Sequence, residues 1–359
     1  MKKLLLTTIM MAAIMGSVFA GGEKESSQKT TTSAHDYALL INGNLGDKSF
    51  HDSANKGILE AGKSLDAQTK VVETGYDSSK WEPALLDLID EKHDVIVCGT
   101  WQLNEIIAKV APQYPEQKFI IYDTSMDYAK GGFDNVYSMQ YKQNDGSFLA
   151  GVLAAEMSKT GEIGFIGGMD NTVILDFLTG YIQGAKTVNP DIKVIPSYIG
   201  NFSDSAKAKE LAFAQYQMGV DIIFACASNA SEGVLQAAKA KGNYCIGVDS
   251  DMAMLYKDSD PEMANLIISS MLKRVDQSIE LALTSDAEGT LAYGTVANLG
   301  IAEDCIGLAD NEIYQKQVPE AVRADVTLYS NKIKNGEITV KTAFNTSSDA
   351  VKAYIDSAR

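Results

Sequence analysis

Apolar runs typical of buried strands alternate with helix-like patterns from residue 37 onward. In the first series, strands are predicted at 37–41, 71–73, 94–98 and 119–122, with helices at 52–65, 81–91 and 103–113 between them. Strands that alternate with helices in this way predict a parallel sheet covered on both faces.

A second series of the same kind begins after residue 143. Strands are predicted at 163–166, 193–198, 221–225, 244–248, 265–270 and 292–299, and helices at 146–157, 172–187, 205–218, 232–240 and 273–283. Ser203 or Asp204 is expected to cap the helix at 205–218. The two series together predict an α/β protein with two Rossmann-like lobes, each built on a parallel sheet.

The N-terminal end has the pattern of a secretory signal peptide. Lys2 and Lys3 precede an apolar run at 4–18, and small residues end at Ala20, where cleavage is expected. Residues 21–35, rich in Gly, Ser, Thr, Lys and Glu, are expected to form a disordered tether. The leader has no cysteine, so we expect a soluble periplasmic or secreted protein without an attached lipid.

The composition excludes several classes of function. The formal net charge is −16, which argues against nucleic acid or an anionic membrane surface as a partner. The three histidines are scattered, and no nucleophile elbow, phosphate-binding loop or metal-ligand cluster is present, so neither a cofactor nor a metal is expected. The cysteines lie in largely apolar surroundings and are expected to be buried thiols, with a Cys226–Cys245 disulfide as the lesser alternative: Cys98, Cys226, Cys245 and Cys305.

Candidate binding residues gather where predicted strands end, which is where open α/β sheets bind ligands. The loop after the first strand contains Asp47, Phe50 and His51, and Asp123 and Asp249 each follow a buried strand. Phe50 either packs in the core or walls a cleft. Asp47 could cap the next helix, and Asp123 is a helix cap, a solvated loop charge or a ligand.

Three further residues have similar alternatives. Trp101 follows a strand and either borders the cleft or belongs to the core. Phe177 lies in the first turns of a helix that follows a Gly-Gly turn. Lys273 is predicted to begin a helix, where a lysine is disfavoured by the helix dipole, which favours a specific role over an ordinary surface position.

Three segments, in order, resemble the basic membrane protein family of ABC-transporter substrate-binding proteins, which includes purine nucleoside receptors. They are the loop DKSFH at 47–51, GVDSD at 247–251 and SSMLKRVD at 269–276. The resemblance covers nearly all of the chain after the leader. It implies a binding protein of an ABC importer that delivers its ligand to membrane permease subunits, works as a monomer and has no enzymatic activity.

The resemblance also implies roles for individual residues. Phe50 and Phe177 would sandwich a purine base, and Asp123 would accept hydrogen bonds from ring N–H groups. Asp249 would accept hydrogen bonds from hydroxyls of the ribose. Lys273 would bind a ribose hydroxyl and pair with Asp249 or Asp123.

The sequence departs from the family pattern at three places. His51 stands where relatives have Asn, and Met252 stands where they have Gln. In 227–233, only Gly233 remains of a Gly-rich loop that would lie beside the sugar. These departures leave riboflavin or another flat heterocycle as an alternative ligand, and a nucleoside-processing enzyme as a more distant one.

Two-lobed periplasmic binding proteins join their lobes by a multi-strand hinge, and we expect the late segments of this chain to form one. Residues 36–142 with 270–296 are assigned to the N-terminal lobe, and 143–269 with 297–359 to the C-terminal lobe.

Overall fold

The computed structural model describes residues 35–359. The predicted signal peptide at 1–20 lies outside the described residues, as does the tether at 21–35 except for its last residue.

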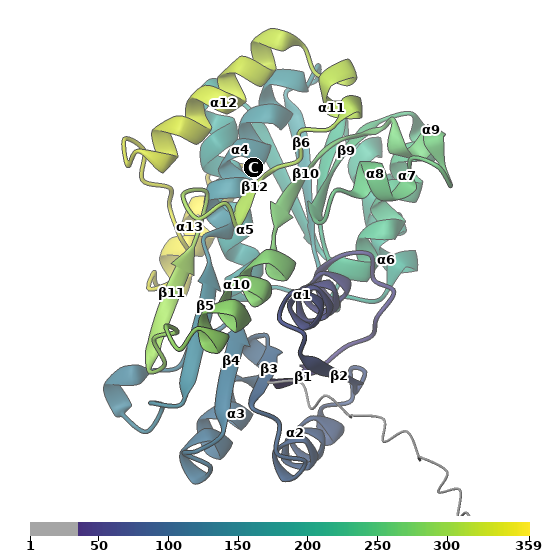
Figure 1. Ribbon diagram of the computed structural model, residues 1–359. Helices are drawn as coiled ribbons and strands as arrows, with labels where there is room; N and C mark the ends of the chain where they lie inside the picture. Colours follow the sequence, from purple (N-terminus) through teal and green to yellow (C-terminus); the bar gives the residue numbers. More distant parts are fainter. Residues whose placement is uncertain (1–34) are drawn as a thin grey trace, which may run out of the picture. The chain divides into compact units, whose positions relative to one another are not determined.

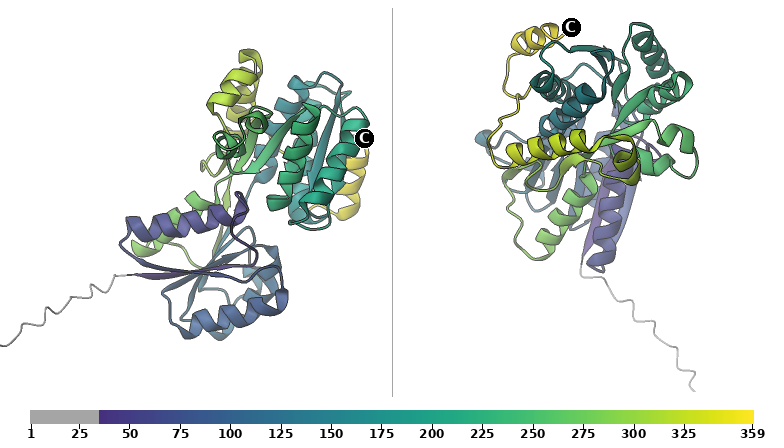
Figure 2. Two further views of the ribbon diagram at one scale, coloured as in Figure 1. Left: turned by 90° about the vertical axis from the view of Figure 1, so that its right-hand side faces the viewer. Right: turned by 90° about the horizontal axis from the view of Figure 1, so that it is seen from above.

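The first lobe is built on a parallel sheet with the strand order β11-β5-β4-β3-β1-β2. Its strands are β1 (Asp36–Ile41), β2 (Gln68–Glu73), β3 (Val95–Gly99), β4 (Lys118–Tyr122), β5 (Val136–Tyr141) and β11 (Thr295–Leu299). Its helices are α1 (Phe50–Ser64), α2 (Trp81–Asp90), α3 (Asn104–Val110) and α10 (Val275–Ala287). Helices α1 and α10 cover one face, and α2 and α3 cover the other (Figure 2).

The second sheet has the order β12-β10-β9-β8-β6-β7, in which only the short β12 is antiparallel to its neighbour. Its strands are β6 (Glu162–Gly167), β7 (Lys193–Tyr198), β8 (Ile222–Cys226), β9 (Tyr244–Asp249), β10 (Ile267–Lys273) and β12 (Ile306–Leu308). Its longer helices are α4 (Gln143–Met157), α5 (Thr172–Val188), α6 (Ser205–Gln217), α7 (Ser231–Lys241) and α12 (Glu320–Lys334). Shorter ones are α8 (Met252–Tyr256), α9 (Pro261–Ala264), α11 (Glu312–Gln317) and α13 (Ser348–Asp356).

Single 3-10 turns complete the secondary structure at Ser78–Lys80, Trp101–Leu103, Ala111–Gln113, Tyr128–Lys130 and Ser228–Ala230. Asp204 caps α6 by accepting a hydrogen bond from the backbone N–H of Lys207, as expected.

Helices α4 and α5 approach each other closely because glycines line their contact. A Cβ on Gly180 would lie 2.1 Å from the carbonyl oxygen of Asn144, and one on Gly184 would lie 1.9 Å from that of Phe148. No side chain fits at these distances. The close helix pair fixes the position of α5, whose first turns border the site described below.

The chain passes between the two sheets at three places in the described residues: from β5 to α4, from β10 to α10 and from β11 to β12 (Figure 1). β10 lies in the second sheet and β11 in the first. The exact lobe boundaries given above stay a prediction. Lys273, which the sequence pattern assigns to the start of a helix, is instead the last residue of β10, and α10 begins at Val275.

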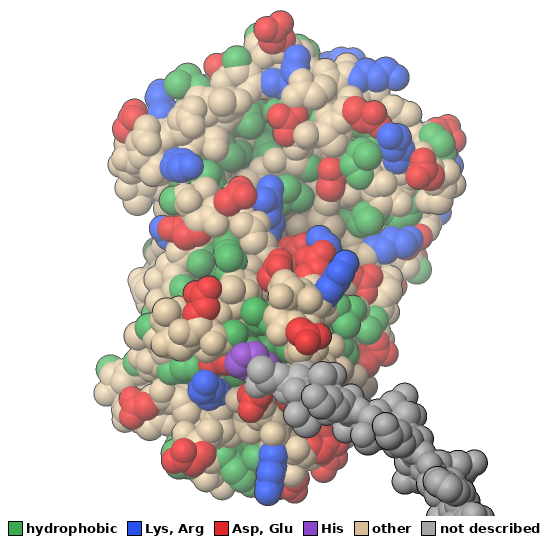
Figure 3. All heavy atoms as spheres, viewed as in Figure 1, with side chains coloured by type: hydrophobic (Ala, Val, Ile, Leu, Met, Phe, Trp, Pro, Cys, Tyr) green, Lys and Arg blue, Asp and Glu red, His purple; other side chains and the backbone are tan. Residues whose placement is uncertain are grey.

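Other sequence expectations concern the cysteines and the surface. All four cysteines are free and buried, which confirms the expected thiols and excludes the Cys226–Cys245 bridge. Acidic and basic side chains are interspersed over the face shown in Figure 3. Among residues 35–359, no helix has the length and apolar character needed to cross a membrane.

Candidate functional site

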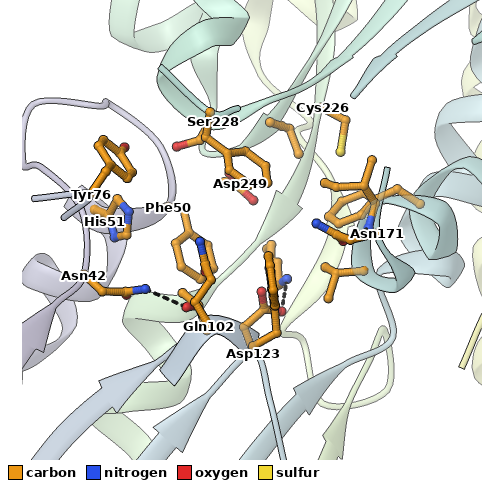
Figure 4. Close-up of a pocket in the computed structure, with 18 residues that line it drawn as sticks. Asn42, Phe50, His51, Tyr76, Gln102, Asp123, Asn171, Cys226, Ser228 and Asp249 are labelled. Atoms are coloured by element: carbon orange, nitrogen blue, oxygen red, sulfur yellow. Dashed lines mark hydrogen bonds and ion pairs between the residues drawn. The ribbon is translucent and has the colours of Figure 1, made fainter. Parts of the chain in front are cut away.

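A cavity lies at the carboxyl ends of the strands of both sheets. About 640 Å³ of space there is free of protein atoms, part of it open to solvent. The order β2-β1-β3 in one sheet and β7-β6-β8 in the other places a topological switch point in each, and open α/β sheets bind ligands outside such points. Residues that directly follow β1, β3 and β4 line the cavity from one lobe, and residues at the ends of β9 and β10 line it from the other (Figure 4).

The backbone of the cavity wall is strained at several residues. Thr100, Asp123, Ser228 and Asp249 all line the cavity and have positive φ values of 74°, 60°, 47° and 65°. Left-handed backbone at residues other than glycine costs about 1–3 kcal/mol each and clusters at functional sites. Four of the nine non-glycine residues with positive φ among residues 35–359 thus line this one cavity, which makes it the candidate functional site.

Aromatic side chains form much of the cavity wall. Phe50 and Phe177 line it from opposite lobes, as the sequence predicts, and Phe202 and Tyr76 join them. Trp101 lines the cavity and is 40 % exposed. It therefore borders the cleft, and its alternative placement in the core is wrong.

A buried ion pair lies among these rings. Lys273, only 1 % exposed, is paired with Asp123, which settles which of the two expected acids is its partner. The Lys273 ammonium lies 5.5 Å from the ring centre of Phe50 and 5.4 Å from that of Phe177. A third ring, Tyr141, lies 4.9 Å from it. The ammonium is thus held by one carboxylate and by aromatic faces.

Asp249 brings a second carboxylate to the cavity. It ends β9, and its Oδ2 accepts a 2.6 Å hydrogen bond from Ser49 Oγ of the opposite lobe. Burial raises the pKa of Asp249 to about 6, although the charge of Lys273 and the Ser49 hydrogen bond act in the other direction. Because the Ser49 bond uses one oxygen, the other oxygen is free of protein partners for an incoming hydroxyl.

Asp47 has a different environment from the other predicted site residues and does not line the cavity. Its carboxylate accepts 3.0 Å hydrogen bonds from the backbone N–H groups of Ser49, His51 and Asp52, and so caps the start of α1. Ser228 Oγ of the other lobe also donates to it, at 2.9 Å. These contacts fix the loop that carries Phe50 and His51.

Three buried polar atoms in residues of the cavity wall have no hydrogen-bond partner: Asn42 Oδ1, His51 Nδ1 and Asn171 Nδ2. Burial lowers the pKa of His51, the neighbouring acids acting against it, so its imidazole is neutral at pH 7. Asn171 caps α5 through its Oδ1, which accepts from the N–H of Ile174. Buried polar atoms are nearly always paired in folded proteins, so these three indicate where a polar ligand binds.

Sequence patterns do not single out several residues of the cavity wall. Asn42, Thr100 and Gln102 follow predicted strands, and Asn171 follows the Gly-Gly turn, so their position at strand ends is the signal that would have identified them.

Comparison with known proteins gives consistent matches over nearly the whole chain. The family described as "ABC transporter substrate-binding protein PnrA-like" matches residues 34–343. The chain is 31 % identical to basic membrane protein A2 of Borrelia garinii, over 95 % of this chain and 96 % of that protein. It is 30 % identical to the ABC transporter nucleoside-binding protein BmpA of Lactococcus lactis, over 95 % and 99 %.

A solved structure supports the same assignment. The ABC transporter solute-binding protein of Aeropyrum pernix superimposes with a TM-score of 0.77 at 27 % identity, covering 90 % of this chain and 97 % of that one.

Proposed function

Because the chain belongs to the family of PnrA-like ABC transporter substrate-binding proteins, we propose that it captures a purine nucleoside between its lobes and delivers it to a membrane permease. Its role as a solute-binding protein of an ABC transporter, and not an enzyme, follows from the family itself. The nucleoside is our proposal, as are a monomeric state and a periplasmic or secreted location.

The observation that carries the proposal is the combination of aromatic faces and carboxylates in one buried cavity. Phe50 and Phe177 offer flat apolar surfaces for a base, and stacking of a base on an aromatic side chain is worth about 1–3 kcal/mol. Asp249 keeps one oxygen free of protein partners, and a carboxylate suits the hydroxyls of a ribose. We assign Asp123 and Lys273 to polar contacts with the same ligand, and Asp47 to holding the loop of Phe50 and His51 against it.

The charge of the cavity supports a neutral ligand. Two carboxylates, Asp123 and Asp249, face one ammonium, Lys273, and His51 is neutral. With Asp249 ionised, these groups sum to one negative charge. A phosphate would add like charge to a buried site, so the arrangement favours nucleosides over nucleotides. The name of the Lactococcus relative, a nucleoside-binding protein, agrees with this choice.

Calorimetry with inosine, guanosine, adenosine and riboflavin tests the proposal. We expect micromolar or tighter binding of at least one purine nucleoside, and chromatography of the released ligand should return it intact. Binding of riboflavin without any nucleoside would contradict the proposal. Recovery of free base and ribose would favour an enzyme.

A matched pair of variants tests the assignment of Asp249. Asp249→Ala should weaken binding by at least about 10-fold, since hydrogen bonds to charged groups contribute roughly 1.5–3 kcal/mol each. Ser250→Ala, its neighbour along the chain, should have little effect. Deoxyribonucleosides should bind the wild-type protein more weakly than ribonucleosides, and that difference should shrink in Asp249→Ala. Equal affinities of the wild-type protein and Asp249→Ala, for ribonucleosides and deoxyribonucleosides alike, would show that Asp249 does not contact the ligand.

A further inference from the structure

The strongest unexplained feature of the cavity is a buried hydrogen-bond acceptor at the end of β1. Asn42 is 1 % exposed and lines the cavity. Its Nδ2 donates a 2.8 Å hydrogen bond to Thr100 Oγ1, drawn as a dashed line in Figure 4. That bond fixes the orientation of the amide, so the Oδ1 that remains without a partner is an acceptor.

Two groups able to donate lie near the Asn42 amide. Thr100 Oγ1 already accepts from Asn42, so its own hydrogen is available to a ligand. The neutral imidazole of His51, 6 % exposed, carries one N–H and has an unpartnered Nδ1. Its Nε2 would lie 2.2 Å from a Cβ on Gly43, so the ring packs directly against the residue that follows Asn42.

A fixed acceptor with two donors near it is complementary to the 6-amino edge of a purine. In adenine, the 6-amino group donates and is flanked by the acceptors N1 and N7, whereas the O6 of a 6-oxopurine accepts. We propose that Asn42, with Thr100 and His51 beside it, makes the cavity select 6-aminopurine nucleosides over 6-oxopurine nucleosides. This inference rests on the proposed nucleoside function and specifies the base.

The preference has a physical cause. An amino group pairs with Asn42 Oδ1, whereas O6 of inosine or guanosine would place two acceptors together in a buried site. A ligand with hydrogen at position 6 would leave Asn42 unpaired. A buried polar group left without a partner lowers affinity by roughly 10-fold or more, so both classes should bind at least that much more weakly than adenosine.

Calorimetry on the full chain, freed of co-purified ligand, tests this with adenosine, inosine and purine riboside, which has hydrogen at position 6. We expect adenosine to bind at least about 10-fold more tightly than the other two. Asn42→Leu should abolish the advantage over purine riboside, and Asn42→Asp, which keeps acceptor oxygens, should retain it. Gln217→Leu removes an exposed amide of α6 that does not line the cavity, and it should leave the ratios unchanged.

Equal or tighter binding of inosine by the wild-type protein would overturn the inference and leave the proposed function standing, even if Asn42→Leu does not fold. An adenosine advantage that survives in a folded Asn42→Leu would also overturn it. Failure of all three ligands to bind would overturn the proposed function together with the inference.

Discussion

At the residue scale, Asp249 couples stability to binding. Its folded-state pKa of about 6 lies above the ordinary value of about 3.9 for an unfolded aspartate. The folded protein therefore holds this proton more tightly than the unfolded chain does. Ionising Asp249 destabilises the fold, and the cost grows as pH rises from about 4 to 6 and is complete above that range. A carboxylate retained at such a cost is consistent with a ligand contact.

Asp249→Asn should therefore stabilise the ligand-free protein at pH 7.5, by up to about 3 kcal/mol. At pH 4 most of the gain should be lost, because the carboxyl of the wild-type protein is then protonated in the folded state and about half protonated in the unfolded state. Urea unfolding at the two pH values measures the difference in unfolding free energy. The exposed Asp258→Asn is the control, and an equal gain at both pH values would contradict the assigned pKa.

Individual site residues are predictable where they follow a strand or belong to a motif. Phe50, His51, Asp123, Phe177, Asp249 and Lys273 all line the cavity. Asn42 was not predicted, because its significance lies in an amide fixed by Thr100, 58 residues away in the chain. The role of Asp47 in capping α1 likewise depends on backbone geometry that a sequence pattern does not contain.

At the element scale, the loop between β1 and α1 connects the two lobes. Lys48 Nζ lies 4.5 Å from the ring centre of Tyr256 in α8 and donates a 3.3 Å hydrogen bond to its hydroxyl. Ser49 donates to Asp249, and Ser228 donates to Asp47. These contacts join the lobes at the edge of the cavity, so they should hold a closed form together over a bound ligand.

Ser49→Ala should accelerate ligand release. Ser49 does not line the cavity, so its effect would pass through the contact between lobes. Loss of one hydrogen bond to a charged acceptor, worth roughly 1.5–3 kcal/mol, should raise the dissociation rate by about 10-fold or more. Stopped-flow displacement measures the rate, with the exposed Ser203→Ala as control. A dissociation rate equal to that of the wild type would show that the Ser49 contact does not hold the lobes closed.

Secondary structure was predictable where apolar runs were uninterrupted. The sequence pattern does not predict β5, because Ser138 and Gln140 interrupt its apolar residues. In the structure, Ser138 is fully buried and hydrogen-bonded to Tyr128. The sequence pattern predicts that this strand ends at Ser270, whereas β10 continues to Lys273. Its buried serines are paired with distant groups: Ser269 donates to the carbonyl of Ala309, and Ser270 accepts from the N–H of Met252. Tertiary hydrogen bonds place polar residues in strands, and a sequence pattern does not contain them.

At the scale of the whole molecule, two sheets of similar strand order, which differ in the direction of one edge strand, face the cavity with their carboxyl edges. The cavity has charged groups from both sheets. The first sheet supplies Asp123, and the second supplies Asp249 and Lys273. The fold class was predictable because strand and helix patterns alternate twice along the chain. The partner of Lys273 was not predictable from the sequence. Asp123 directly follows β4 and Asp249 ends β9, so only the three-dimensional arrangement distinguishes them.

Nucleoside monophosphates should bind at least about 10-fold more weakly than their nucleosides at pH 7.5, because a phosphate would meet the excess negative charge of the cavity. Calorimetry with adenosine and its 5′-monophosphate gives the ratio. Similar affinities for the two would show that the phosphate lies outside the cavity or that the charge balance is misassigned.

Mass spectrometry of the small molecule released from purified protein tests the central claim most directly. Denaturing the protein without prior exposure to added ligand should release an intact purine nucleoside at a substantial fraction of the protein concentration. Release of a flavin or another heterocycle, with no nucleoside recovered and none bound in subsequent calorimetry, would contradict the claim that this cavity is built for purine nucleosides.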